Sequence, residues 1–195
     1  MMRSVCLVVS LAALTACVSV LPEKKTPEAL YRFGPMDAAH TVSSSIMVRE
    51  PEASRLFAGR AIAAEGPDGG LRLVPGVEWA DSATRMMQVA LLDSLGGEGS
   101  SVAVTSITGA PTDYEIAWRI SDFTLHDASA RCRLEATLLN GRDRTVIAQK
   151  LIETSADADS NRNGDRAKAL TDAGRACVKD VAAFVVNATQ TDTDD

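Results

Sequence analysis

The sequence predicts an α+β domain in which an antiparallel β-sheet, built from hairpins, carries two main α-helices on one face. Several short segments alternate apolar and polar residues, which is typical of half-buried strands, and turn-forming residues join them in pairs. Two longer segments repeat apolar residues at steps of three and four, which indicates helices. The order along the 195-residue chain is strands, helix, strands, helix, and it favours helices packed on a sheet.

An apolar leader precedes these elements. Twelve of the first 16 residues are apolar, and Arg3 is the only charged residue before Glu23. A short basic start, an apolar stretch and small residues before a cleavage point are the parts of a secretory signal. We therefore expect residues 1–16 to be a signal peptide. The alternative is a signal anchor that spans a membrane with the stretch from Ser4 to Leu21.

The leader ends in a lipidation motif. Leu14, Thr15, Ala16 and Cys17 resemble the lipobox of bacterial lipoproteins, in which an aliphatic residue and two small residues precede a cysteine. In that motif the thiol takes a diacylglyceryl group, the small residues admit the signal peptidase, and the freed cysteine amine becomes the new N-terminus. We therefore expect lipidation at Cys17, followed by a tether that ends at residue 29 and contains two prolines and a Glu-Lys-Lys cluster.

Val18 follows the expected lipid attachment site. In the sorting rule known for enteric bacteria, an aspartate at this position retains a lipoprotein in the inner membrane, whereas valine releases it. The sequence therefore predicts anchoring at the periplasmic face of the outer membrane, with the inner membrane as the alternative.

The domain is expected over residues 30–188, and its first half contains strands and one helix. We expect strands over 29–33 and 45–49, and a hairpin of strands 59–65 and 71–74. The helix is expected from Ser82 to Leu95, because Asp81 or Ser82 suits its N-cap and two glycines at 96 and 97 end it.

The second half is expected to contain longer strands. These strands are predicted over 101–107, 114–125, 131–139 and 145–152. The apolar face of the second of them changes at Ser121-Asp122, which indicates a β-bulge. Asn140-Gly141 separates the last two strands and is typical of a type I′ hairpin turn.

The chain is expected to close with a helix over about 165–188 and a disordered acidic tail over 189–195. The helix has an apolar stripe at steps of three and four. The stripe consists of Leu170, Gly174, Cys177, Val181, Phe184 and Ala188.

Two cysteines remain in the mature domain, Cys132 and Cys177. The first lies on the apolar face of a predicted strand and the second on the apolar stripe of the last helix, so we expect them to meet in the core. In an oxidising compartment this pattern predicts a Cys132–Cys177 disulfide, and two buried thiols are the alternative. No pair of cysteines has the CxxC spacing of a zinc ribbon or of a thioredoxin-like site.

The composition excludes several functional classes. The formal net charge is −6, with 20 Lys and Arg against 26 Asp and Glu, which argues against nucleic-acid binding. Only two histidines are present, and the chain has no G-x-S-x-G elbow, Walker loop or Rossmann fingerprint. We therefore predict no catalytic residue, no cofactor and no metal site. His126, beside Asp127, is interpreted as a surface imidazole.

One segment imitates a calcium-binding loop. Asp159, Asn161 and Asn163 occupy positions one, three and five of such a loop, and Gly164 occupies position six. The twelfth position requires a bidentate glutamate, but this sequence has Leu170 there. The segment is better interpreted as a polar turn that caps the last helix.

The first helix offers a candidate contact surface. Met86, Met87, Val89 and Ala90 lie along it, and methionine suits adaptable contacts with a lipid or a partner. The alternative is that these residues fill the core.

The domain resembles a known family in four segments. These segments are Tyr31–Phe33, Ile46–Pro51, Leu56–Arg60 and Val77–Asp81, the last of which is centred on Trp79. Together with the lipobox they make the chain similar, over about residues 30–186, to the ABC-type transport auxiliary lipoproteins, which include paraquat-inducible protein C.

The resemblance implies a non-enzymatic subunit of a lipid-transport system in the bacterial envelope. Its expected partners are an MCE-domain protein in the periplasm, the associated ABC permease and ATPase, and a phospholipid cargo. Self-association into a homo-oligomer stays open. A scaffold lipoprotein of another envelope assembly or secretion machine is the alternative function, and a periplasmic hydrolase is a third class.

Overall fold

The computed structural model describes residues 26–38, 40–96, 99 and 101–194. The signal peptide, the lipobox with Cys17 and most of the expected tether therefore lie outside the described residues. No helix within the described ranges is long and apolar enough to cross a membrane.

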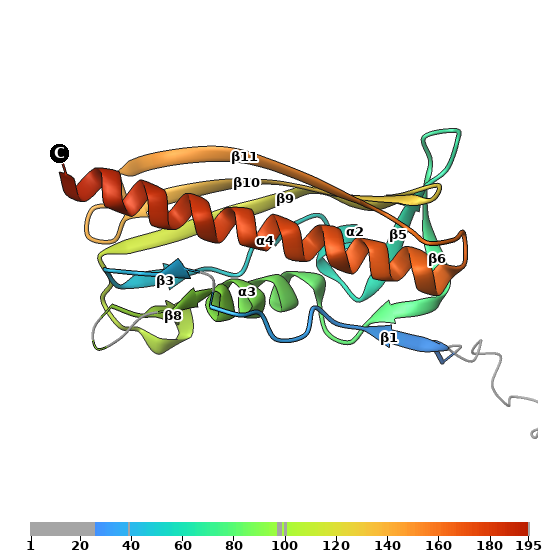
Figure 1. Ribbon diagram of the computed structural model, residues 1–195, viewed down its shortest axis with the longest axis horizontal. Coiled ribbons are helices and arrows are strands. Elements are labelled where there is room, and N and C mark those ends of the chain that lie inside the picture. The colour runs from blue at the N-terminus through green and yellow to red at the C-terminus, as the bar shows by residue number, and fades with distance from the viewer. Residues whose placement is uncertain (1–25, 39, 97–98, 100, 195) are drawn as a thin grey trace, which may run out of the picture.

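A large curled sheet forms most of the molecule (Figure 1). Its main path has the strand order β1-β6-β5-β9-β10-β11, and β3, β4 and β8 join it through β9 or through each other. The strands of this sheet are β1 (Ala29–Tyr31), β3 (Ile46–Val48), β4 (Glu52–Ala53), β5 (Ala61–Glu65), β6 (Leu71–Trp79), β8 (Ala103–Thr105), β9 (Tyr114–His126), β10 (Ser129–Asn140) and β11 (Val146–Asp157). A separate small sheet pairs β2 (His40–Thr41) with β7 (Leu95–Gly96).

The α+β class is confirmed, but the expectation of a purely antiparallel sheet of hairpins is wrong. The pairs β5–β6, β9–β10 and β10–β11 are antiparallel. In contrast, β3, β4 and β5 all pair with β9 in parallel, and β1 pairs with β6 in parallel. Turn residues reveal only pairings between neighbours in sequence, whereas parallel pairs need long connections that carry no local signal.

Helices α2 (Arg55–Ala58), α3 (Ala83–Ser94) and α4 (Asn163–Asp194) complete the fold. The short α2 was not expected. The predicted start of α3 is confirmed, because the hydroxyl of Ser82 accepts a hydrogen bond from the backbone N–H of Arg85 at 3.3 Å. The long α4 runs along the sheet in Figure 1 and contacts β9, β10 and β11.

The C-terminal end of α4 differs from the expected disordered tail. The helix continues to Asp194 instead of ending near residue 188. Thr189 is buried, and the hydroxyl of Tyr114 donates to a carboxylate oxygen of Asp192 at 2.9 Å. These tertiary contacts hold the last turns, although acidic residues at a helix C-terminus are unfavourable by themselves.

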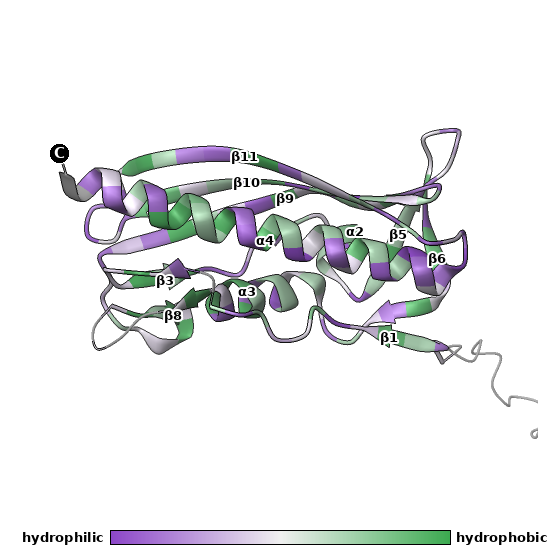
Figure 2. Ribbon diagram, viewed as in Figure 1, coloured by the Kyte–Doolittle hydropathy of each residue, from purple (hydrophilic) through white to green (hydrophobic). Residues whose placement is uncertain are grey.

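The core lies between the sheet, α3 and α4. The predicted stripe of α4 faces it, with Leu170, Cys177 and Val181 fully buried, and polar and apolar bands alternate along this helix in Figure 2. At its centre the rings of Phe33 and Trp79 form a T-shaped pair. Trp79 also stacks on Phe123, with ring centroids 5.4 Å apart.

The predicted bulge in β9 is confirmed. Arg133 pairs with Asp122 and the next residue, Leu134, pairs with Ile120, so Ser121 is the extra residue. The bulge lets both halves of β9 bury their apolar residues although the alternation changes between them.

The predicted hairpin of β10 and β11 exists, but the prediction of a type I′ turn at Asn140-Gly141 is wrong. The backbone N–H of Asn140 donates to the carbonyl of Thr145 at 2.9 Å, so the connection is longer, and Arg144 has the left-handed φ of 63°. The N–H of Gly141 donates to the carbonyl of Asp113 at 2.7 Å, and a β-carbon there would collide with the carbonyl of Thr112. Gly141 therefore permits a close backbone approach.

Candidate functional site

The face of β9 and β10 that points away from α4 carries charged side chains. Along β9, Ile116, Trp118 and Ile120 are buried, and Ala117 and Arg119 alternate with them on the opposite face. The neighbouring positions on β10 are Glu135 opposite Arg119 and Thr137 opposite Ala117. The alternation of a strand thus produces an apolar inner face and a polar outer face.

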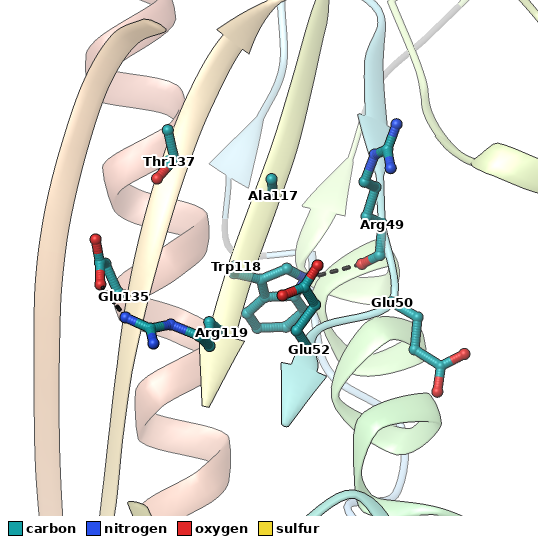
Figure 3. A pocket seen from close by; sticks show the side chains of 8 residues that line it. All are labelled: Arg49, Glu50, Glu52, Ala117, Trp118, Arg119, Glu135 and Thr137. Atoms are coloured by element: carbon teal, nitrogen blue, oxygen red, sulfur yellow. Dashed lines mark hydrogen bonds and ion pairs between the residues drawn. The ribbon is translucent and has the colours of Figure 1, made fainter. Parts of the chain in front are cut away.

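A hollow of about 260 Å³ lies on this outer face, and we call it the charged hollow (Figure 3). One wall comes from β9 and β10, and the other comes from β4 and the segment that connects β3 with it. The lining residues are Arg49, Glu50, Glu52, Ala117, Trp118, Arg119, Glu135 and Thr137.

The walls of the charged hollow are fixed by hydrogen bonds. Trp118 lies between β9 and the β3–β4 segment in Figure 3, and its indole N–H donates to the carbonyl of Arg49 at 2.8 Å. Arg119 donates to Glu135 at 2.9 Å. Glu50 accepts from the hydroxyl of Thr84 at the N-terminal end of α3. These bonds connect the two walls of the hollow to each other and one of them to α3.

One buried carboxylate stands beside the charged hollow. Glu115 is 5% exposed, and its two carboxylate oxygens accept hydrogen bonds from Arg49 and from Arg144, the latter at 2.6 Å. Further along the same face Arg133 pairs with Glu153 at 3.8 Å. Because charges of both signs alternate over this face, it suits a polar protein surface with complementary charges.

The lining of the charged hollow is polar and carries charges of both signs. Its lining residues offer three carboxylates, two guanidinium groups and one hydroxyl. A nucleophile activated by a neighbouring base, the arrangement that covalent catalysis needs, is not found among these lining residues. The hollow can form ion pairs and hydrogen bonds with a partner.

Cys132 and Cys177 meet in the core as the sequence predicted, but the disulfide is not formed. Both are free thiols and are fully buried, and the Sγ of Cys177 donates to the carbonyl of Cys132 at 3.3 Å. Burial, and then the hydrogen bond with Cys177, raises the pKa of the Cys132 thiol well above its usual range. The alternative of two buried thiols describes the structure.

His126 belongs to a polar cluster that sequence reasoning missed. Its Nε2 lies 2.8 Å from the hydroxyl of Thr124, and its Nδ1 lies 3.4 Å from a carboxylate oxygen of Glu65. Arg131 pairs with Asp122 at 2.6 Å in the same cluster. The signal in the sequence was the two-residue spacing of Asp122, Thr124 and His126 on one strand face, but Glu65 comes from the distant strand β5.

The segment that imitates a calcium loop leads into α4, and its side chains bond to a side chain in the first turn of that helix. Ser160 and Arg162 both donate to the carboxylate of Asp165 in the first turn of the helix, and these bonds, that of Ser160 first, lower the pKa of Asp165. Within the described ranges no group of three or more potential metal ligands gathers.

The candidate surface on α3 is mostly core. Met86, Met87 and Ala90 are buried, and only Val89, at 40%, is exposed. The alternative interpretation therefore holds for three of the four residues. Val89 borders a hollow of about 510 Å³ that α3 shares with the segment after β1.

Comparison with solved structures supports the fold. Protein XCC0632 from Xanthomonas campestris is 20% identical, with a TM-score of 0.72, and the match covers 86% of this chain and 100% of that chain. The hypothetical protein CT253 from Chlamydia trachomatis is 12% identical, with a TM-score of 0.50, over 76% of this chain and 99% of that one. At these identities the likeness concerns the fold alone.

Comparison with the curated proteins finds no match. A family model does match, over residues 34–182, and it describes the ABC-type transport auxiliary lipoprotein component. The match covers β2 to β11, helices α2 and α3, the first part of α4 and the charged hollow, whereas β1 and the end of α4 lie outside it. The chain belongs to the family of ABC-type transport auxiliary lipoprotein components.

Proposed function

We propose that this chain is a non-enzymatic auxiliary lipoprotein of an MCE-type ABC lipid-transport system in the bacterial envelope. In this proposal acylated Cys17 anchors the chain at the periplasmic face of the outer membrane. The folded domain docks the periplasmic MCE-domain protein, which works with an ABC permease and ATPase on a phospholipid cargo.

Family membership over residues 34–182 is the observation that carries this proposal. The lipobox from Leu14 to Cys17 precedes the matched region in the order that a lipoprotein requires. Two or three acyl chains would hold the domain at a membrane without a spanning helix.

We assign the charged hollow to the contact with the MCE-domain protein. Its fixed walls and its charges of both signs favour a specific polar contact. Trp118 supports the hollow from within, whereas Arg119 and Glu135 are accessible, with side chains 64% and 36% exposed. Such rim charges contribute to the rate and the specificity of association.

Affinity purification of the lipidated protein from membranes tests the partner. We expect an MCE-domain protein and its permease to be recovered. Arg119→Glu should weaken this recovery, while Lys179→Glu, on the exposed side of α4, makes the same change of charge and should leave it intact. Recovery of secretion or lipopolysaccharide-assembly components instead would favour the alternative scaffold function.

The mass of the mature protein tests the anchor. We expect a chain that begins at Cys17 and carries a diacylglyceryl group, and Cys17→Ala should abolish this modification. Membrane fractionation then tests the location. The native chain should be found in the outer membrane, Val18→Asp should move it to the inner membrane, and Val18→Ala is the matched control.

A further inference from the structure

Three leucines are exposed on two paired strands at one end of the sheet. Leu30 of β1 is 53% exposed, and Leu71 and Leu73 of β6 are 46% and 60% exposed. Strands β1 and β6 pair in parallel. Figure 1 shows both at the end of the molecule from which the N-terminal segment leaves. Exposed leucines on paired strands are candidates for contact with a partner or a membrane.

Leu73 lies beside the point where the described chain begins. The residues that line a hollow of about 350 Å³ include Thr26, Pro27 and Glu28 of the first described segment and Leu73 of β6. The backbone N–H of Glu28 donates to the carbonyl of Gly76 at 2.8 Å, which fixes this segment against β6. The entry of the tether and Leu73 therefore line the same hollow, and Leu71 and Leu30 lie on the same pair of strands.

The charged residue between Leu71 and Leu73 has an ion-pair partner. Arg72, between Leu71 and Leu73, pairs with Asp68 at 2.6 Å. An arginine stem can also lie along an apolar phase while its guanidinium remains in water. Arg72 can thus come close to an apolar layer without becoming an isolated buried charge.

The length of the chain between Cys17 and Thr26 limits how far this end can be from an anchored lipid. Nine residues in fully extended form reach at most about 32 Å. Helix α4, with 32 residues, is about 48 Å long. The connection is shorter than the domain, so a lipid on Cys17 keeps the end with Leu73 close to the membrane.

We propose that the surface formed by Leu30, Leu71 and Leu73 lies against the lipid bilayer in which the chain is anchored. This inference rests on the proposed acylation of Cys17. Because the acyl chains already hold the protein at the membrane, the leucines set the orientation of the domain. They turn the opposite end, next to β8, towards the aqueous space.

A fluorescent label on the lipidated full-length mature chain tests this orientation. A thiol-reactive NBD dye is attached at Leu73→Cys, with Leu71→Cys as a second position. The matched control is Ile107→Cys, which replaces an apolar residue that is 85% exposed and follows β8 at the other end. The native thiols Cys132 and Cys177 are buried and do not compete for the dye.

In vesicles of phosphatidylethanolamine and phosphatidylglycerol, iodide quenching of the label at position 73 should fall about threefold relative to lipid-free protein. Quenching at position 107 should not change. If the protein floats with the vesicles but position 73 stays open to iodide, the orientation is wrong while the anchor stands. If the native chain does not float, both the anchor and this inference fail.

A mature chain that begins at residue 17 and carries Cys17→Ser distinguishes contact with the membrane from contact with a second copy of the chain. Without vesicles its label at position 73 should remain open to iodide at every protein concentration. Protection that rises with protein concentration would show that a second copy covers the leucines, and this result would overturn the inference.

Discussion

Gly174 of α4 lies against the ring of Phe33, so closely that a β-carbon at position 174 would be 2.6 Å from Cζ of that ring. The same β-carbon would be 3.1 Å from Cε2 of Phe123. Both rings pack with Trp79 in one aromatic cluster. The helix therefore reaches this cluster only because residue 174 has no side chain.

Gly174→Ala should destabilise the protein. Overpacking of a core costs about 1–3 kcal/mol, and the better helix propensity of alanine returns about 1 kcal/mol, so we expect a net loss of up to about 2 kcal/mol. Urea unfolding measures it. Gly59→Ala is the control, because its β-carbon meets only the carbonyl of Arg55 at 3.6 Å. A Gly174→Ala protein as stable as this control would contradict the close approach.

Cys132 and Cys177 should be unreactive in the folded protein. Both thiols are fully buried, and burial raises the pKa of Cys132, which suppresses the reactive thiolate. With a mature chain that begins at residue 17 and carries Cys17→Ser, so that Cys6 and Cys17 are both absent, a thiol reagent should modify neither residue in buffer and both in denaturant. A denatured chain that offers no free thiol before reduction would contradict the structure.

The pairing of Glu115 should contribute to stability. This carboxylate is buried and has two arginine partners, so Arg144→Ala leaves it partly unpaired and should cost about 1–3 kcal/mol. Arg119→Ala, which breaks the exposed pair with Glu135 on the same face, should cost at most about 1 kcal/mol. Thermal unfolding of the two variants compares these costs. Equal losses would mean that burial does not distinguish the pairs.

The sequence was informative where the signal was local. The change of alternation at Ser121 predicted the bulge, and the apolar positions of Cys132 and Cys177 predicted that the two residues meet. The redox state of the thiols could not follow from position, because meeting in the core is compatible with a hydrogen bond as well as with a disulfide. Gly141 was misread because its neighbour Thr112 is distant in the sequence.

The charged hollow could not be predicted for the same reason. Arg49 and Trp118 come together only because β3 and β4 pair with β9 in parallel, and such pairing has no local signature. The helical end of the chain depends likewise on Tyr114, which lies far from Asp192 in sequence. Local patterns thus located most of the elements, whereas the long-range contacts that form the site required the fold.

The hydrogen bonds between Ser45 and Asp113 should make the stability of the protein depend on pH. The carboxylate of Asp113 accepts hydrogen bonds from the hydroxyl of Ser45 at 2.8 Å and from its backbone N–H at 3.0 Å. These bonds, that of the hydroxyl first, lower the pKa of Asp113 below its ordinary value of 3.8. A carboxyl group whose pKa is lower in the folded state than in the unfolded state stabilises the protein at pH values above its unfolded-state pKa. The contribution should therefore be lost as pH falls from about 4 through the folded-state pKa.

Ser45→Ala tests this relationship, because it removes the hydroxyl and keeps the backbone N–H. The pKa of Asp113, followed by NMR, should rise towards 3.8. The free energy of unfolding at neutral pH should fall by less than about 1 kcal/mol, since the pair is exposed to solvent. The variant and the native chain should become more nearly equal in stability as the pH approaches 2. A difference that is the same at pH 7 and pH 2 would show that the hydroxyl acts without regard to the charge of Asp113.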